Sequence, residues 1–177
     1  EHDLSESAPM NVGNFNGLME APRMLAGCAA ALTTETGNIG YLGALINPET
    51  RRLVVAADLG ARYCYENYRG GDPDELTFTV TWIGFWFNIP GVTLDPTEVS
   101  NEFFNSGADV IISGIDTTEA ITVAGQRTAE GERVFAVPYG NANGCSEAPD
   151  ACLGVAFYNW GPAYLDVVNR VMDGTWE

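Results

Sequence analysis

Four short apolar segments, each followed by a turn and a helix-like stretch, organise this sequence. They are NIGYLGALINPE, FTVTWIGFWF, ADVIISGIDTTE and VFAVPYGNANG. Strands that alternate with helices form a parallel sheet, and such sheets bind ligands beyond the carboxyl ends of their strands. The pattern therefore predicts an α/β fold and directs the search for function to the residues that follow each strand.

Apolar spacing and start and stop signals define the predicted elements. The predicted strands are 38–45, 76–84, 108–115, 133–139 and a short fifth one at 153–157, and the predicted helices are 18–34, 48–68, 96–105, one ending at 126, and 162–172. Asn47 and Asp95 are predicted N-caps because proline follows each at the first helical position, and Thr117 or Thr118 is predicted to cap the fourth helix. We expect a parallel sheet of about five strands with helices on both faces.

Charge narrows the choice of partners. The 177 residues include 24 acidic and 8 basic residues, for a net charge of -16, and every basic residue is an arginine. Such a surface repels nucleic acids and anionic membranes, and no apolar run is long enough to span a bilayer. We expect no nucleic-acid partner and no direct membrane span. The simplest interpretation of the acidic residues is a solvated surface that keeps the protein soluble.

The first ten residues are polar and lack hydrophobic periodicity, so we expect a tail at 1–10 and one α/β lobe over 11–177. The single histidine, His2, lies in that tail, which excludes a histidine-based triad or zinc cluster elsewhere. No nucleophile elbow, phosphate-binding loop or dinucleotide fingerprint is present. The sequence therefore predicts a protein that is not an enzyme and implies no cofactor or metal.

The four cysteines suggest at least one disulfide. Cys145 and Cys152 bracket a loop rich in Ser, Pro and Asp, which suits a small disulfide-closed loop. Cys28 and Cys64 fall on two predicted helices, where they either pair or remain buried thiols, and we favour buried thiols. A disulfide would indicate an extracytoplasmic compartment.

Six segments occur in the order found in one protein family: GNIGYLGALINPE, LGAR, FWFN, GADVIISGIDTTEA, RVFAVPYG and NWGPAYLDVVNRVMDGTW. The chain resembles the basic membrane lipoprotein (BMP) family, whose members are substrate-binding proteins of ABC importers and include purine-nucleoside receptors. The match runs from Asn11 to Trp176. It implies one lobe of a two-lobed type 1 periplasmic-binding-protein fold, resembling the second lobe, with the first lobe and a lipoprotein signal expected before Asn11.

The resemblance implies a ligand site between lobes, an ABC permease as partner, and an extracytoplasmic, lipid-anchored protein. Trp86 and Phe87 match the family's aromatic loop, where a ring stacks on a base, and Trp160 matches the family at the hinge or cleft wall. Asp116 and Asn47 follow strands and either bind ligand or cap helices. Among these residues, the stacking role of Trp86 is the sharpest hypothesis.

The chain departs from the family's nucleoside receptors after the fourth strand. There it has Tyr139, Gly140 and Asn141, where those relatives carry an Asp-x-Asp motif that holds ribose, and Leu45 replaces a phenylalanine. Asn141 can still donate and accept hydrogen bonds to a sugar or base. We therefore expect a small polar ligand such as a nucleoside or nucleobase. The alternative is a stand-alone extracellular sensory or interaction domain derived from the same fold.

Overall fold

A computed structural model describes residues 12, 13 and 15–176 of the chain. The chain divides into two compact units, a larger one formed by Met19–Phe157 and a smaller one formed by the two ends of the chain. The predicted polar tail at 1–10, with His2, lies outside the described residues.

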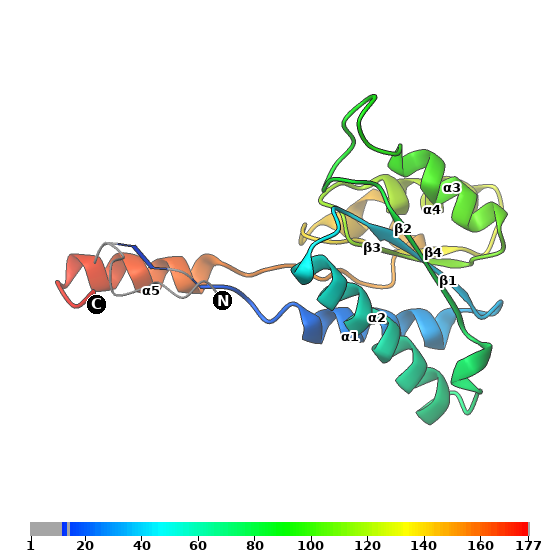
Figure 1. Cartoon of the computed structure of the whole chain (residues 1–177), viewed down its shortest axis with the longest axis horizontal. Coiled ribbons are helices and arrows are strands. Elements are labelled where there is room, and N and C mark those ends of the chain that lie inside the picture. The colour runs from blue at the N-terminus through cyan, green and yellow to red at the C-terminus, as the bar shows by residue number, and fades with distance from the viewer. Residues whose placement is uncertain (1–11, 14, 177) are drawn as a thin grey trace. The chain divides into compact units, whose positions relative to one another are not determined.

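A parallel sheet forms the centre of the larger unit (Figure 1). Its strands are β1 (Asn38–Gly43), β2 (Thr77–Trp82), β3 (Val110–Ser113) and β4 (Phe135–Val137). They are arranged in the order β2-β1-β3-β4, and each neighbouring pair is parallel. The predicted α/β class and parallel sheet are confirmed, and all carboxyl ends of the strands meet at one edge.

The predicted fifth strand at 153–157 is not formed. This segment contributes two isolated bridges, Ala136 to Cys152 and Tyr139 to Ala156. Between these bridges lies Gly154, whose φ of 136° is outside the range of a regular strand. The glycine therefore turns the chain away from β4 before a continuous ladder can form, and the sheet has four strands within the described residues.

Helices cover both faces of the sheet, as predicted (Figure 1). The helices α1 (Glu20–Thr33) and α2 (Pro48–Asn67) lie on one face, and α3 (Pro96–Asn105) and α4 (Glu119–Ala129) lie on the other. Three short 3-10 helices, η1 (Pro73–Glu75), η2 (Gly144–Glu147) and η3 (Pro149–Ala151), complete the unit. Each helical layer packs its apolar side chains into its own core cluster against the sheet.

Two of the predicted caps form. Asn47 accepts a hydrogen bond from the Thr50 backbone N–H at 2.8 Å, and the Thr50 hydroxyl accepts one from the Asn47 N–H at 3.0 Å. Asp95 accepts from the Thr97 N–H at 2.8 Å. Thr118 occupies the N-cap position of α4, one of the two positions predicted, but its side chain makes no capping hydrogen bond.

The helices α1 and α2 pack backbone against backbone. A Cβ atom on Gly27 would lie 1.9 Å from the Ala57 carbonyl oxygen, and one on Gly60 would lie 2.1 Å from the Met24 carbonyl oxygen. At this short separation a disulfide joins Cys28 to Cys64. The interpretation of these two residues as thiols is therefore wrong, because sequence spacing does not reveal that two glycines bring the helices so close.

The second disulfide joins Cys145 to Cys152 and closes the loop that contains η2 and η3. This is the bridge that the Ser-, Pro- and Asp-rich segment predicts. The described residues contain no free cysteine.

In the smaller unit, α5 (Gly161–Met172) confirms the last predicted helix. The ring of Trp160 stacks on Tyr158 with centroids 4.6 Å apart, and Phe15 meets Trp160 edge-on. No helix in the described part of the chain is both long and apolar enough to cross a membrane.

Candidate functional site

A small pocket of about 20 Å³ lies at the carboxyl edge of the sheet in the larger unit. Four aromatic side chains line it: Tyr41 of β1, Trp82 of β2, Trp86 in the loop after β2, and Tyr139 after β4. The remaining wall comes from Gly114, after β3, and from the first turns of α2, including Glu49 and Thr50. The pocket lies where parallel-sheet proteins bind ligands, and four of its nine lining residues are aromatic.

Glycines let the aromatic rings lie flat at this edge. A Cβ atom on Gly43 would lie 2.6 Å from the Cε3 atom of Trp82, and one on Gly114 would lie 2.8 Å from the Tyr41 hydroxyl. Trp82 and Tyr41 therefore cover the backbone of neighbouring strands. Neither residue was predicted to bind ligand, although a glycine within a strand, as Gly43 is at the end of β1, marks a close approach of a neighbouring group.

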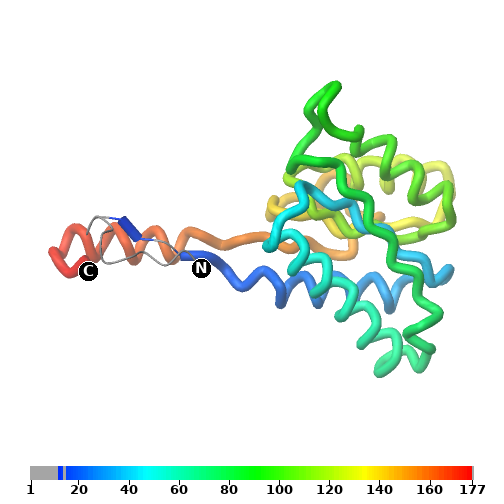
Figure 2. Tube along the Cα trace, in the orientation of Figure 1, coloured from blue at the N-terminus to red at the C-terminus, as the bar shows by residue number. Residues whose placement is uncertain are grey.

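The loop between β2 and α3 extends away from the sheet at this edge (Figure 2). Trp86 lies at the start of this loop, lines the pocket and is partly buried against the core that α3 and α4 cover. Phe87 is 45% exposed and does not line the pocket, and its ring meets Phe85 edge-on at 4.8 Å. The geometry thus separates the two residues of the aromatic motif: Trp86 faces the pocket, whereas Phe87 packs within its own loop.

Asp116 follows β3 and is tied to the aromatic loop. Its backbone N–H donates to the Trp86 carbonyl oxygen at 2.8 Å. A Cβ atom on Gly140 would lie 3.6 Å from the Asp116 carboxyl oxygen, so this carboxyl group lies beside the exit of β4. Asp116 as a whole is exposed. Its carboxyl group is nevertheless partly buried, and this burial raises the pKa of that group.

Asn47 and Asn141 both use their side chains locally. Asn47 caps α2, which is the role expected as the alternative to ligand binding. The Asn141 side chain accepts a hydrogen bond from the Asn143 N–H at 2.9 Å and is otherwise exposed. Asn47 lies next to the pocket through Glu49 and Thr50, whereas Asn141 follows the pocket residue Tyr139 by two positions.

Trp160 belongs to the smaller unit, and its described ring neighbours, Phe15, Tyr158 and Tyr164, all belong to that unit as well. The structure therefore brings Trp86 and Asp116 together and gives no site that includes Trp160. No group of three His, Cys, Asp or Glu side chains in the described ranges is placed to hold a metal ion.

A fully buried arginine lies behind the pocket. Arg23 of α1 is 0% exposed, and its guanidinium carbon lies 5.0 Å from the Tyr41 ring centroid and 5.2 Å from that of Tyr139. Its Nη2 atom donates to the Ser113 carbonyl oxygen at 2.7 Å, whereas Nε and Nη1 have no hydrogen-bond partner among the described residues. Arg23 thus ties two pocket tyrosines to the end of β3 and places a positive charge behind them. No sequence pattern predicted this contact, because Arg23 occupies an ordinary position in a helix.

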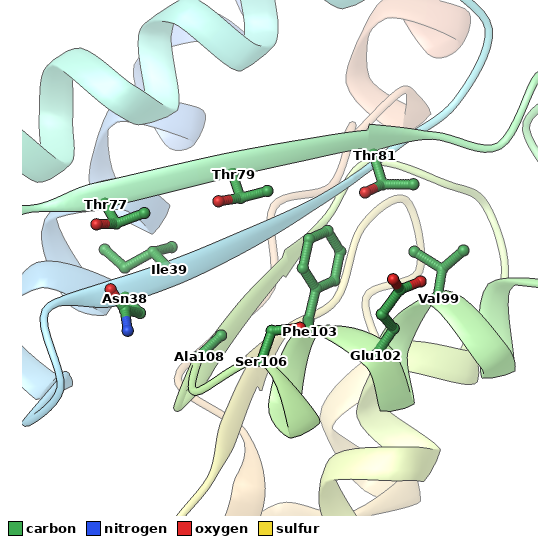
Figure 3. A pocket seen from close by; sticks show the side chains of 10 residues that line it. All are labelled: Asn38, Ile39, Thr77, Thr79, Thr81, Val99, Glu102, Phe103, Ser106 and Ala108. Carbon is green, nitrogen blue, oxygen red and sulfur yellow. The ribbon is translucent and has the colours of Figure 1, made fainter.

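A second hollow, of about 180 Å³, lies between the edge strand β2 and α3 (Figure 3). Thr77, Thr79 and Thr81 project from one face of β2 toward Phe103 of α3. The threonines alternate along the strand, so they share one face. No residue predicted to bind ligand lines this hollow, and the aromatic pocket at the other end of β2 remains the candidate site.

Comparison with known sequences supports a binding role. No family model matches the chain. A purine-binding protein from Brucella abortus is 30% identical over the whole chain, which spans 45% of that relative. A putative ABC transporter glucose-binding protein from Haloferax volcanii is also 30% identical over the whole chain, which spans 41% of it. The chain therefore spans less than half the length of these curated relatives. Both relatives are named as binding proteins.

Solved structures show the same fold. An ABC transporter solute-binding protein from Aeropyrum pernix K1 aligns with a TM-score of 0.71 at 15% identity, over 89% of this chain and 43% of that one. A transcriptional activator of the comK gene from Bacillus halodurans aligns with a TM-score of 0.66 at 21% identity, over 89% of this chain and 49% of that one. The chain thus has the fold of one lobe of a solute-binding protein, and the predicted resemblance to substrate-binding proteins of ABC transporters is confirmed.

Proposed function

We propose that this chain is one wall of the ligand cleft in an extracytoplasmic substrate-binding protein of an ABC importer, and that the ligand is a nucleobase or nucleoside. The observation that carries the proposal is the convergence of Trp82, Trp86, Tyr41 and Tyr139 at the carboxyl edge of the sheet. Parallel-sheet proteins bind their ligands at this edge, and a lobe that closes on a second lobe buries the ligand there.

An aromatic wall suits a planar ligand. Stacking on an aromatic side chain contributes about 1 to 3 kcal/mol per base in proteins that bind single-stranded nucleic acids, and the same attraction acts on a free base. Trp86 is the best placed ring, because it lines the pocket and lies in the loop between β2 and α3. Trp82, which also lines the pocket, is the second stacking candidate.

Polar groups beside the rings supply the means to orient such a ligand. Asp116 lies between the exits of β3 and β4, where its carboxyl group accepts hydrogen bonds from ligand amine or hydroxyl groups. Glu49 lines the mouth of the pocket and is exposed. Asn141 is close enough in sequence to Tyr139 to contribute a donor or an acceptor. We assign Phe87 and Asn47 supporting roles in the loop and the α2 cap, and we assign Trp160 to the hinge.

The proposal extends to the protein's surroundings. An importer needs a permease partner, and its binding protein works outside the cytoplasmic membrane, where disulfides persist. Both cysteine pairs of this chain form disulfides. The names of the two curated relatives divide between a purine and glucose, and both ligands have faces that stack on aromatic rings. We favour the planar base because the pocket combines two tryptophans with the carboxylate of Glu49.

Isothermal titration with adenine, adenosine and D-glucose tests the proposal on the complete protein. We expect binding of adenine or adenosine, and Trp86→Ala should weaken it by about 10-fold or more through the loss of stacking. Phe87→Ala is the matched control, because Phe87 lies in the same loop but outside the pocket. It should leave affinity nearly unchanged.

Two results would count against this function. Preferential binding of D-glucose would move the ligand class to a sugar, and equal effects of Trp86→Ala and Phe87→Ala would remove the stacking role. Binding of none of the three, together with a native mass near that of this chain alone, would favour a stand-alone sensory or interaction domain.

A further inference from the structure

The outer surface of α1 and α2 is apolar, although both helices already bury an inner face against the sheet. The large side chains exposed on this surface include Leu25 at 70%, Tyr63 at 54%, Leu59 at 54% and Leu32 at 47%. Leu25 and Leu32 are seven residues apart, so they lie on one line along α1. Each of these helices needs only one apolar face to pack against the sheet, yet each also has an apolar face that is exposed. Contiguous exposed apolar patches mark interaction surfaces.

This surface has the relief of an interface. A groove of about 450 Å³ runs between the two helices, with Leu25 and Leu32 on the α1 side and Tyr63 and Tyr68 on the α2 side. The disulfide between Cys28 and Cys64 lines the groove and fixes the distance between its walls. The groove is therefore a preformed hollow bordered by projecting side chains, and little side-chain or backbone ordering is needed before another surface docks.

Charge indicates which partner fits. Within α1 and α2 the acidic residues Glu20, Glu49, Asp58 and Glu66 are balanced by four arginines, at positions 23, 51, 52 and 62, of which Arg23 is buried on the inner side. These two helices are therefore neutral, and the entire net charge of -16 lies elsewhere in the chain. A basic partner would be drawn to the acidic remainder, whereas two copies of this chain repel one another everywhere except at a neutral layer.

We propose that the α1–α2 surface is the interface of a homodimer, in which a twofold axis places the Leu25 and Leu32 ridge of each copy into the groove of the other. A twofold contact requires a surface that complements itself, and this one combines a ridge with a groove. The centre of such interfaces is apolar and poor in charge, as this groove is.

The interface leaves the aromatic pocket open. The pocket takes Glu49, Thr50 and Leu53 from the beginning of α2, whereas the groove takes Gly60, Tyr63 and Tyr68 from its end. A dimer formed through the groove therefore does not depend on the proposed ligand, and its test is separate from the titrations above.

Sedimentation velocity over a range of protein concentrations tests the dimer. The unmodified protein should sediment as a dimer at high concentration. Leu25→Asp should raise the dimer dissociation constant by about 30-fold or more, because it places a carboxylate at the centre of an apolar contact. The side chain is 70% exposed, so the substitution should leave the fold intact, which circular dichroism checks. Tyr63→Arg is a second variant, on α2, with the same expected loss.

Val92→Asp is the matched control, because Val92 is 77% exposed in the loop between β2 and α3 and lies outside the groove. It should not change the dissociation constant. Raising the salt concentration should strengthen the wild-type dimer by screening the repulsion between two acidic chains. A monomer at all concentrations and salt levels would overturn the proposal, as would a dimer that both groove variants leave unchanged. A contact that involves another partner or another part of a longer chain would give the monomeric result.

Discussion

The two helical layers that sandwich the sheet are held together in different ways. The α1–α2 layer is neutral, joins its helices through glycine contacts and a disulfide, and exposes several large apolar side chains. The α3–α4 layer exposes none of the large apolar side chains found on the surface of the described residues, and Arg127 links its helices through polar contacts. Covering a sheet needs only one apolar face per helix, so the surplus on α1 and α2 indicates a second role for that layer.

The largest difference between the layers should appear when their disulfides are removed. Cys28 and Cys64 are 36 positions apart, and Cys145 and Cys152 are 7 apart. The loss of unfolded-state entropy on closing these loops is worth about 4 kcal/mol for the first and about 2.5 kcal/mol for the second. Replacing each pair by alanine and measuring unfolding in guanidinium should give this order. The reverse order would mean that the short loop near α4 holds more of the fold than the α1–α2 contact does.

A methyl group added to Gly27, where α1 and α2 are in contact, should lower the stability of the fold. The Cβ atom of Gly27→Ala would lie 1.9 Å from the Ala57 carbonyl oxygen, an atom that cannot move without shifting α2. We expect a loss of about 3 kcal/mol, at the upper end for overpacked sites, because the disulfide prevents the helices from separating freely. Thermal unfolding measures the effect.

Gly125→Ala on α4 is the matched comparison for this substitution. Its Cβ atom would lie 2.5 Å from the Cβ atom of Ala148, which belongs to a loop and can be displaced. We expect a loss of about 1 kcal/mol. Equal losses at both glycines would show that the two layers tolerate crowding alike, which contradicts the distinction between a rigid and an adjustable layer.

The α3–α4 layer should be the more sensitive to loss of a single polar side chain. Arg127 of α4 donates to the Asn101 side chain at 2.9 Å and to the Asn105 side chain at 2.6 Å, and its side chain is only 15% exposed. Arg127→Ala should therefore cost about 1 to 2 kcal/mol, since it leaves the partly buried acceptor on Asn101 of α3 without this donor.

In the other layer, Arg52 lies 3.6 Å from Glu20, and the two side chains are 49% and 34% exposed. Arg52→Ala should cost no more than about 0.5 kcal/mol, because exposed ion pairs contribute little. Urea unfolding of both variants gives the comparison. A larger effect for Arg52 than for Arg127 would mean that charge, rather than close packing, holds α1 against α2.

Local signals in the sequence predicted most of this fold. Asn47 and Asp95, each followed by proline, located the starts of α2 and α3, and the apolar segments located all four strands. These features act within a few residues and so are visible in the sequence. The fifth strand was wrong because alternation alone cannot show that Gly154 adopts a φ of 136°.

The candidate site was predicted less completely, because it depends on contacts between distant segments. Asp116 was selected because it follows a strand and Trp86 because it matches the family's aromatic loop, and the structure joins them by a backbone hydrogen bond. Trp82 was not predicted to bind ligand, yet it lines the pocket because Gly43 on the neighbouring strand leaves room for its ring. The contact of Arg23 with the Ser113 carbonyl spans 90 positions, and no local pattern encodes it.

The smallest expected change in stability concerns Asp116, which follows β3 and lies beside the exit of β4. Partial burial raises the pKa of its carboxyl group in the folded protein above the ordinary value of 3.8. The folded state therefore holds this proton more tightly than the unfolded state does. Stability from this group is fully present below the unfolded-state pKa and is lost as the pH rises through the raised folded-state pKa.

Asp116→Asn keeps the side chain neutral at every pH and should reveal that loss. Thermal unfolding of the variant and the parent should coincide near pH 3, and the variant should become the more stable one as the pH rises toward neutrality. Asp150→Asn, at an exposed position on η3, is the control for nonspecific charge removal from an acidic chain. If both substitutions stabilise the protein equally, relief of general repulsion explains the gain. A gain in stability at Asp116 alone would show that its carboxyl group is costly to ionise without a partner. A ligand amine or hydroxyl group that donates a hydrogen bond to it would then lower its raised pKa.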